Sequence, residues 1–348
     1  MGSVKDLTVI KEPTETEMGV GRFHFSDRYS VFDWGEMPDQ ILNKGAALCM
    51  IAACCFEEVE KRGVPHHYRG LVNAAGELVS SYRLDAPSAT MEIDLVRVVR
   101  PEFKDGKYDY TIVSSQQKNS LLPLEVIYRN SLPKGSSIFK RLKEGMLNYQ
   151  DLGLDHPPKP GEVLPKPLIE VTTKLESTDR HLSWEEAREI TGMVPLEEYA
   201  LHQHTLTAAR VITDFAQRAG LNNEDGKVEY ARDSRGKLML VDVFGTPDEC
   251  RFTMQGMPVS KEIARQFYQG SAWQDAVIAA KLEAKQKGTS DWKNLCPLTP
   301  GPLPFKLLDI ISQMYMSTAN AFLGRKAFDS SPLEKVVERY MRWKTSHS

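Results

Sequence analysis

Two strand-like segments, Asp225-Gly-Lys-Val-Glu-Tyr230 and Leu240-Val-Asp-Val-Phe-Gly-Thr-Pro-Asp-Glu-Cys-Arg251, carry charged residues where a strand is normally apolar. Between them lies Arg232-Asp-Ser-Arg-Gly-Lys237, which is rich in turn-forming residues. This order of strand, turn and strand predicts a β-hairpin.

Pairing in this hairpin would bring Glu229 and Asp242 together, with Lys227 beside them. Magnesium prefers oxygen ligands and commonly bridges carboxylates to phosphates, and a lysine neutralises phosphate charge. The hairpin therefore indicates a magnesium–nucleotide site. The alternative is a solvated hairpin with a surface ion pair, because alternating charge is common on the exposed face of antiparallel sheets.

The composition is that of an ordinary globular protein. The 348 residues are 26% charged and 41% hydrophobic, with a formal net charge of -3. This balance gives no basic field for binding nucleic acid. No apolar run reaches the roughly 18 residues that a membrane span needs, so we expect no membrane partner.

The cysteines and the start of the chain favour a cytoplasmic location. The five cysteines are Cys49, Cys54, Cys55, Cys250 and Cys296. Their number is odd, their spacing fits no metal site, and three lie in one apolar segment, so we expect reduced core thiols. The N-terminus lacks the apolar stretch of a secretory signal.

Local patterns predict the main elements. Strands are expected near residues 4–10, 21–25, 71–72, 78–82, 91–99, 108–113, 124–131 and 167–171, and helices over 46–62, 138–144, 195–219, 305–324 and 332–343, with further helices starting at Ser183 and Ser260. Residues 151–167 are expected to form a loop, and His66 and His67 to lie in a solvated loop.

A break in the sheet is predicted at residues 118–123, which contain Pro123. We accordingly place a domain boundary there, with a β-rich lobe over residues 1–122 and a second lobe over 123–348. A backbone segment that crosses between lobes can bind the edge of an adenine ring.

Two stretches suit anions. Gly2 opens a strand that could lie over nucleotide phosphates, with Lys5 as the charge. Arg129 ends a predicted strand, and a Gly-Ser-Ser turn then starts a helix whose N-terminus could bind an anion. Simple N-capping of that helix by Ser136 or Ser137 is the alternative.

The ordered set of motifs resembles the SAICAR synthetase family. The matching stretches are Gly2-x-Val-Lys-Asp-Leu7, Ser26-Asp-Arg-Tyr-Ser-Val-Phe-Asp33, Asn43-Lys-Gly45, Glu125-Val-Ile-Tyr-Arg129, Gly135-Ser136, Thr172-Thr-Lys174, Asp225-x-Lys-x-Glu229, Asp242 to Arg251 and Pro302-Leu-Pro304. Each motif alone is weak, but their order along the whole chain is specific.

The resemblance implies an α+β, two-lobed fold, with an N-terminal antiparallel β-rich lobe, a C-terminal α/β lobe, and ATP between them. It implies a purine-pathway ligase that condenses 5-aminoimidazole ribonucleotide carboxylate (CAIR) with L-aspartate, using ATP and Mg²⁺. A carboxylate becomes electrophilic when phosphorylated, and phosphoryl transfer needs positioning and charge neutralisation more than a nucleophilic side chain.

The resemblance also implies roles for particular residues. ATP would contact Gly2, Ser3, Val4, Lys5, Leu121, Glu125, Lys227, Glu229 and Asp242, and the metal would be held by Glu229 and Asp242. The ribonucleotide would be bound by Ser30, Arg129, Ser136, Arg251 and Arg265. Asp33, Lys174, Asp179, Asp225, Lys227 and Asp248 would surround the reacting groups.

The sequence departs from the family pattern at a few positions. Ser3 replaces a basic residue, Val243 replaces a second carboxylate, and Thr178 replaces a histidine. Glu249 and Cys250 replace small residues before Arg251. These departures leave two alternatives open: a diverged paralogue that joins a different acid or amine, and a catalytically inactive nucleotide-binding protein. Assembly into a homo-oligomer is compatible with the ligase and with both alternatives.

Overall fold

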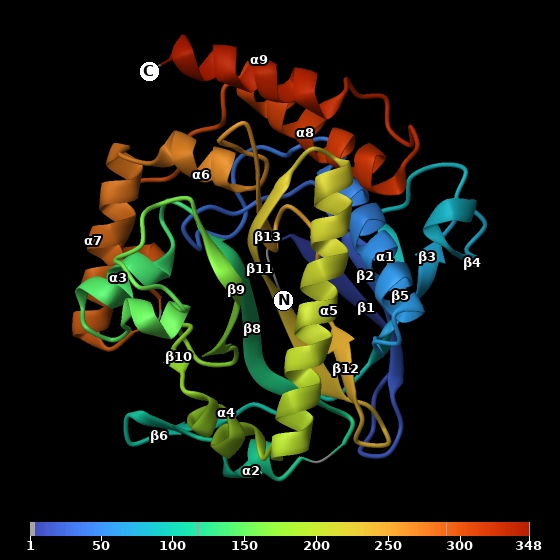
Figure 1. Ribbon diagram of the computed structural model, residues 1–348, viewed down its shortest axis with the longest axis vertical. Coiled ribbons are helices and arrows are strands. Elements are labelled where there is room, and N and C mark those ends of the chain that lie inside the picture. Colours follow the sequence, from blue (N-terminus) through green and yellow to red (C-terminus); the bar gives the residue numbers. More distant parts are fainter. Residues whose placement is uncertain (1–3, 117, 290, 348) are drawn as a thin grey trace.

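A computed structural model describes residues 4–116, 118–289 and 291–347 (Figure 1). Gly2 and Ser3, two of the expected ATP contacts, lie outside the described residues. In the described part no helix is long and apolar enough to cross a membrane.

The described strands form two main antiparallel sheets, as expected for an α+β fold. The N-terminal sheet has the order β1 (Lys5–Lys11), β2 (Gly19–Phe25), β5 (Thr90–Leu95), β3 (Tyr68–Val72) and β4 (Leu78–Val79). The second sheet has the order β10 (His181–Leu182), β9 (Glu162–Thr173), β8 (Ser120–Leu132), β11 (Asn222–Arg232), β13 (Cys250–Met254) and β14 (Met257–Pro258), and β12 (Leu238–Val241) also pairs with β11. A separate hairpin joins β6 (Glu102–Lys104) and β7 (Lys107–Asp109).

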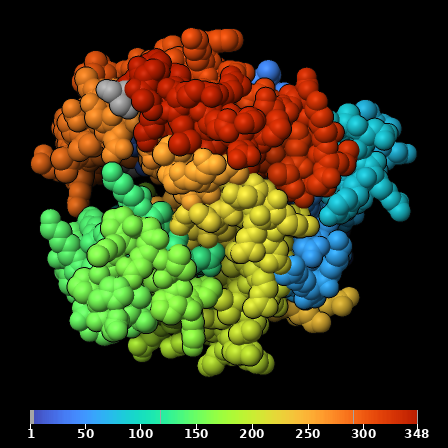
Figure 2. All heavy atoms as spheres, turned by 45° about the horizontal axis from the view of Figure 1, so that its top comes forward, coloured from blue at the N-terminus to red at the C-terminus, as the bar shows by residue number. Residues whose placement is uncertain are grey.

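Helices cover both sheets. They are α1 (Lys44–Lys61), α2 (Thr111–Ser114), α3 (Ser137–Lys143), α4 (Trp184–Thr191), α5 (Pro195–Arg218), α6 (Glu262–Tyr268), α7 (Ala272–Lys287), α8 (Phe305–Leu323) and α9 (Leu333–Thr345). Short 3₁₀ turns are η1 (Ser81–Arg83), η2 (Tyr149–Leu152) and η3 (Lys293–Leu295). Helix α5 crosses in front of the second sheet (Figure 1), and the red C-terminal segment lies beside the yellow end of α5 (Figure 2).

Helix α1 is the central element of the core. It is apolar on nearly every side and packs against β2, β3 and β5 as well as α5 and α8, so it joins the two halves of the molecule. Cys49, Cys54 and Cys55 are buried in it, which confirms their predicted place in the core.

The Asn43-Lys-Gly45 motif anchors the start of α1. The Asp27 carboxylate accepts hydrogen bonds from the backbone N–H groups of Asn43 (3.0 Å) and Gly45 (2.9 Å). A Cβ atom at Gly45 would lie 2.6 Å from the carbonyl oxygen of Phe25, so only glycine permits this approach. The motif thus fixes the direction in which Lys44 points.

Several local predictions are wrong. Strand β8 runs without a break from Ser120, because a register shift opposite β11 accommodates Pro123, which cannot donate a ladder hydrogen bond. Residues 111–113 are helical, because the Asp109 carboxylate accepts from the N–H of Thr111. Strand β9 begins at Glu162, inside the expected loop. Strand β4 ends at Val79 and is followed by a 3₁₀ turn.

The two sheets are tied together by isolated parallel bridges, His66 to Leu240 and Arg97 to Ser120. The expected solvated loop at His66 and His67 is therefore wrong. His67 is buried, and its backbone N–H donates to the carbonyl of Leu240. This contact holds the N-terminal sheet against the predicted hairpin.

Candidate active site

A cavity of about 670 Å³ lies between the two sheets. Its apolar part is formed by side chains of β1, β2, β5 and β12, such as Leu7 and Val241. Its charged part contains most of the predicted nucleotide contacts. Among the predicted site residues, those that line it are Val4, Lys5, Ser30, Leu121, Lys174, Lys227, Glu229, Asp242 and Asp248. The volume is in the range of small-molecule sites.

The predicted hairpin between β11 and β12 is confirmed. Glu229 pairs with Val241 in the ladder, which brings Asp242 next to Glu229. Asp242 has a left-handed backbone (φ 61°), and the buried His67 Nε2–H donates to its carbonyl oxygen at 3.0 Å. Glu229 is only 3% exposed, so the alternative of a solvated hairpin is wrong.

Lysines from distant segments pair with the acidic groups of the hairpin and its neighbours. Lys5 Nζ of β1 donates to Asp242 at 2.5 Å, and Lys174 pairs with Glu229. Lys227 Nζ lies 2.7 Å from Glu125 and 3.4 Å from Glu249. Positive and negative groups thus alternate along the cavity wall.

The two hairpin carboxylates have opposite pKa shifts. Burial raises the pKa of Glu229, and the nearby Asp242 charge raises it further. Burial acts in the same sense on Asp242, but the charges of Lys5 and Lys174 outweigh it and hold its pKa well below the usual range. A buried carboxylate pair of this kind is stabilised by additional positive charge.

The acidic residues fit a magnesium ion that also binds phosphate. Glu229 and Asp242 offer oxygen ligands to one cavity. Within the described residues no group of three or more His, Cys, Asp or Glu side chains is arranged to hold a metal. Magnesium bound with phosphates needs only one or two protein carboxylates, because phosphate oxygens and waters fill the remaining positions.

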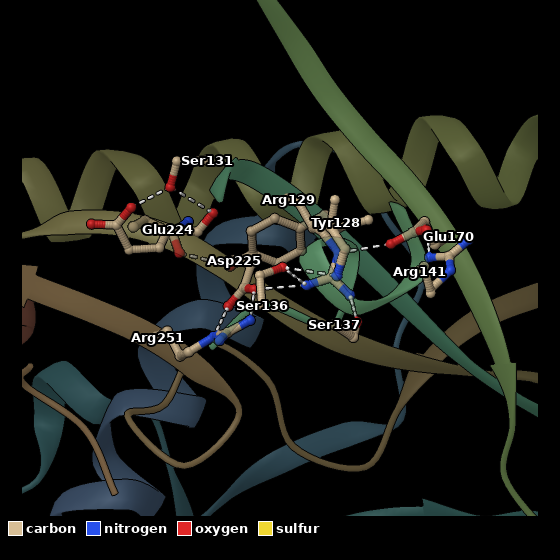
Figure 3. Close-up of polar contacts among 12 residues, drawn as sticks. Tyr128, Arg129, Ser131, Ser136, Ser137, Arg141, Glu170, Glu224, Asp225 and Arg251 are labelled. Carbon is tan, nitrogen blue, oxygen red and sulfur yellow. Dashed lines mark hydrogen bonds and ion pairs between the residues drawn. The ribbon is translucent and has the colours of Figure 1, made fainter. Parts of the chain in front are cut away.

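A second cluster surrounds Arg129 (Figure 3). The Arg129 guanidinium donates to Glu170 (2.7 Å), Asp225 (3.0 Å) and the Ser137 hydroxyl (3.2 Å). Arg251 Nε donates to Asp225 at 2.7 Å, and Arg141 pairs with Glu170. Three guanidinium groups share two carboxylates, so the cluster keeps an excess of positive charge that suits an anion.

Strand β11 connects the cluster to the cavity. Asp225, Lys227 and Glu229 alternate along it, so their side chains lie on one face of the sheet. A Cβ atom at Gly226 would lie 2.6 Å from the Tyr128 hydroxyl oxygen and 2.7 Å from Cys250 Sγ, which explains the glycine between the charged residues.

Ser136 accepts a hydrogen bond from the N–H of Ile138 and caps α3. The capping alternative is thus observed, and the same hydroxyl lies 3.5 Å from an Arg129 nitrogen.

Other predicted residues lie farther out. Asp33 is 85% exposed in its side chain and pairs with Lys281, and Arg265 is 45% exposed and pairs with Glu262. The structure does not bring either into the cavity wall. Asp179 is also exposed and is not among the described residues that line the cavity.

The cavity also contains residues that sequence reasoning did not assign to the site, among them Lys44, His67 and Lys261. Lys44 is completely buried, and its Nζ donates to Asp248 at 2.7 Å. The Asn43-Lys-Gly45 motif contained a signal for Lys44, because a lysine in so apolar a segment needs a buried partner. No local signal marked His67, whose contact with Asp242 depends on pairing between the sheets.

Comparisons with known proteins identify the family of this chain. The family model for SAICAR synthetase matches residues 2–280. A protein of Archaeoglobus fulgidus assigned as a phosphoribosylaminoimidazole-succinocarboxamide synthase is 44% identical over 339 residues, which cover 97% of this chain and 98% of the relative. The phosphoribosylaminoimidazole-succinocarboxamide synthase of Thermoplasma acidophilum is 32% identical over 87% of this chain and 93% of its own length.

Solved structures show the same fold. The SAICAR synthase of Saccharomyces cerevisiae, complexed with SAICAR, has a TM-score of 0.63 at 19% identity and covers 94% of each chain. A SAICAR synthetase in complex with ADP has a TM-score of 0.55 at 19% identity, covering 87% of this chain and 99% of that one.

Fold and sequence therefore define an α+β enzyme, a ligase of purine biosynthesis. The chain belongs to the SAICAR synthetase family.

The Arg129 cluster predicts a measurable effect of Asp225→Asn. Asparagine keeps the size of the side chain but removes the charge shared by Arg129 and Arg251. We expect the free energy of unfolding, measured by urea denaturation, to fall by about 2–3 kcal/mol.

The control is Glu262→Gln, which breaks the more exposed pair with Arg265. This variant should lose less than about 1 kcal/mol. Equal losses in the two variants would contradict a structural role for the cluster.

Proposed function

We propose that this enzyme condenses CAIR with L-aspartate and converts ATP to ADP and phosphate, giving SAICAR. The observation that carries the proposal is the position of β11. It bears Lys227 and Glu229 in the cavity and Asp225 in the arginine cluster, so one rigid strand would hold a nucleotide and a sugar phosphate side by side.

The proposed reaction has two steps. The CAIR carboxylate attacks the terminal phosphorus of ATP, the bond to ADP breaks, and an acyl phosphate forms. The aspartate amine then attacks the acyl carbon, loses a proton, and expels phosphate. Both steps depend mainly on alignment and on neutralising phosphate charge.

The residues that contact ATP in this proposal line the cavity. The apolar side chains and the backbone of Leu121 would bind the adenine, and Val4 and Lys5 would lie over the phosphates. Lys174 and Lys227 would exchange their carboxylate partners for phosphate oxygens. Glu229 and Asp242 would hold Mg²⁺, which would supply positive charge against the phosphates.

The ribonucleotide phosphate would bind to the arginine cluster in this proposal. Arg129 and Arg251 supply forked donors that match phosphate oxygens, and the Ser136 hydroxyl adds a further donor. Ser30 lines the adjoining cavity. Asp248 would lie beside the reacting groups, and Asp33, Asp179 and Arg265 would approach them only if the outer segments move. Asp225, which the resemblance placed at the reacting groups, would instead orient Arg129 and Arg251.

Further aspects of the proposal concern organisation and location. Residues 1–122 would form the nucleotide lobe and 123–348 the substrate lobe, with ATP between them. Strand β8 begins three residues before this boundary, at Ser120, and continues through it.

All five cysteines are free thiols, which supports a reducing cytoplasm. Assembly of the chain into a homo-oligomer is part of the same proposal.

The direct test is an assay of the purified protein with ATP, Mg²⁺, CAIR and L-aspartate. We expect release of ADP and the succinocarboxamide, detected by chromatography. Absence of product from folded protein that binds ATP would overturn the proposed reaction.

Lys227→Ala and Asp242→Asn should each lower kcat by at least about 100-fold, because each removes a preorganised charge from the phosphoryl-transfer site. Steady-state kinetics measures this effect. Lys237→Ala, in the exposed turn of the same hairpin, is the matched control and should retain the wild-type rate. Wild-type rates in the two cavity variants would show that the hairpin takes no part in the reaction.

Arg251→Ala should raise the KM for CAIR by at least about tenfold, the loss expected when a hydrogen bond to a charged group is removed. The effect on kcat should be smaller, since a phosphate remote from the reacting carbon contributes mainly binding energy. Arg235→Ala, in the exposed hairpin turn, should leave the KM unchanged. An unchanged KM in Arg251→Ala would remove this residue from the substrate site.

A second candidate is the ligation of another amine by the same chemistry. The observation that favours it is Glu249, a cavity residue whose buried carboxylate oxygen Oε2 lies 3.4 Å from Lys227 Nζ but forms no hydrogen bond with a described residue. This group could accept from an amine other than aspartate. A panel of amines would decide, and higher kcat/KM with another amine than with aspartate would favour this candidate.

A further inference from the structure

Asp248, in the cavity wall, has protein donors on both carboxylate oxygens. Lys44 Nζ, in the first turn of α1, donates to Oδ2 at 2.7 Å. The Tyr315 hydroxyl, on α8, donates to Oδ1 at 2.5 Å. Lys44 and Tyr315 are both buried, so neither contact is exchanged for water.

The same three side chains also contact one another. The Lys44 ammonium lies 5.5 Å from the centroid of the Tyr315 ring. With a donor on each oxygen, the carboxylate cannot rotate freely. A carboxylate has about four acceptor positions, so Asp248 retains lone pairs for a donor in the cavity that it lines.

The surrounding charges keep Asp248 ionised. Burial raises its pKa, but the charges of Lys44 and Lys261 and the hydrogen bonds from Lys44 and Tyr315 outweigh that effect. The pKa is therefore below its ordinary value. The groups responsible come from three elements: α1, the turn before α6, and α8.

The family model matches residues 2–280 and therefore does not cover Tyr315. The family match thus assigns no role to this tyrosine. We infer that Tyr315 is a positioning residue which, with Lys44, holds Asp248 as an oriented, ionised acceptor for an amino group of a bound substrate. This inference rests on the proposed function for its substrates. The two proposed substrates, L-aspartate and the aminoimidazole ribonucleotide, each carry an amino group.

Tyr315→Phe tests the inference, because phenylalanine retains the ring beside Lys44 and removes only the hydroxyl. We expect kcat/KM to fall by about tenfold, the loss typical of one hydrogen bond to a charged group. The acidic limb of the pH–rate profile should move to higher pH, since loss of a donor to the ionised carboxylate raises its pKa. The substrate whose KM rises carries the amino group that Asp248 contacts.

Tyr340→Phe is the matched control. Tyr340 is a buried tyrosine on α9, and its hydroxyl forms no hydrogen bond with a described residue. Its removal should leave the pH–rate profile as in the wild type. Thermal unfolding of both variants reports any general loss of stability.

A measurement that needs no enzymatic turnover distinguishes failure of this inference from failure of the proposed function. The titration of Asp248 can be followed by NMR with carboxyl-¹³C-labelled aspartate, using Asp248→Asn to assign the signal. Tyr315→Phe should raise the titration midpoint. An unchanged midpoint would overturn the inference. A raised midpoint with wild-type kcat/KM would overturn it as well, whereas an inactive wild-type enzyme would overturn the proposed function instead.

Discussion

The structure depends on the neutralisation of two neighbouring carboxylates buried in a hairpin. Glu229 and Asp242 lie side by side because β11 and β12 pair in one register. Alone, such a pair would be unfavourable, since like charges repel and burial removes their hydration. Lys5 on β1 and Lys174, directly after β9, reach the pair and offset the repulsion. The cavity is thus held in shape by charges that belong to different parts of the chain.

This arrangement connects stability with function. In the proposed function, the lysines that neutralise the carboxylates in the protein alone would bind phosphate, and a metal ion would replace them at the carboxylates. The Arg129 cluster follows the same rule, since its guanidinium groups are preorganised by Glu170 and Asp225 and retain an excess positive charge.

Helix α1 gives the charged cavity its rigid support. It packs against the N-terminal sheet and against α5 and α8. Its first turn projects Lys44 to Asp248, where α8 adds Tyr315. A segment near the C-terminal end of the chain therefore supports Asp248 in the wall of a cavity that also contains residues of β1.

Local patterns predicted much of this molecule. The hairpin, the long helix α5, the terminal helices, the buried cysteines and the ordered motifs were all recognisable, because periodicity and turn chemistry act over a few residues. Local patterns failed at Pro123, which a bulge in β8 accommodates, and at Thr111, whose backbone N–H donates to the Asp109 carboxylate at the start of a helical turn.

The sequence by itself determined the fold class, the family, and which charged residues face one side of β11. Only the tertiary structure decided which lysine meets which carboxylate, that His67 supports Asp242, and that Tyr315 reaches Asp248. The physical reason is the range of the interactions. Strand and helix patterns arise between near neighbours, whereas the partner of a buried charge comes from whichever distant segment packing brings within about 3 Å.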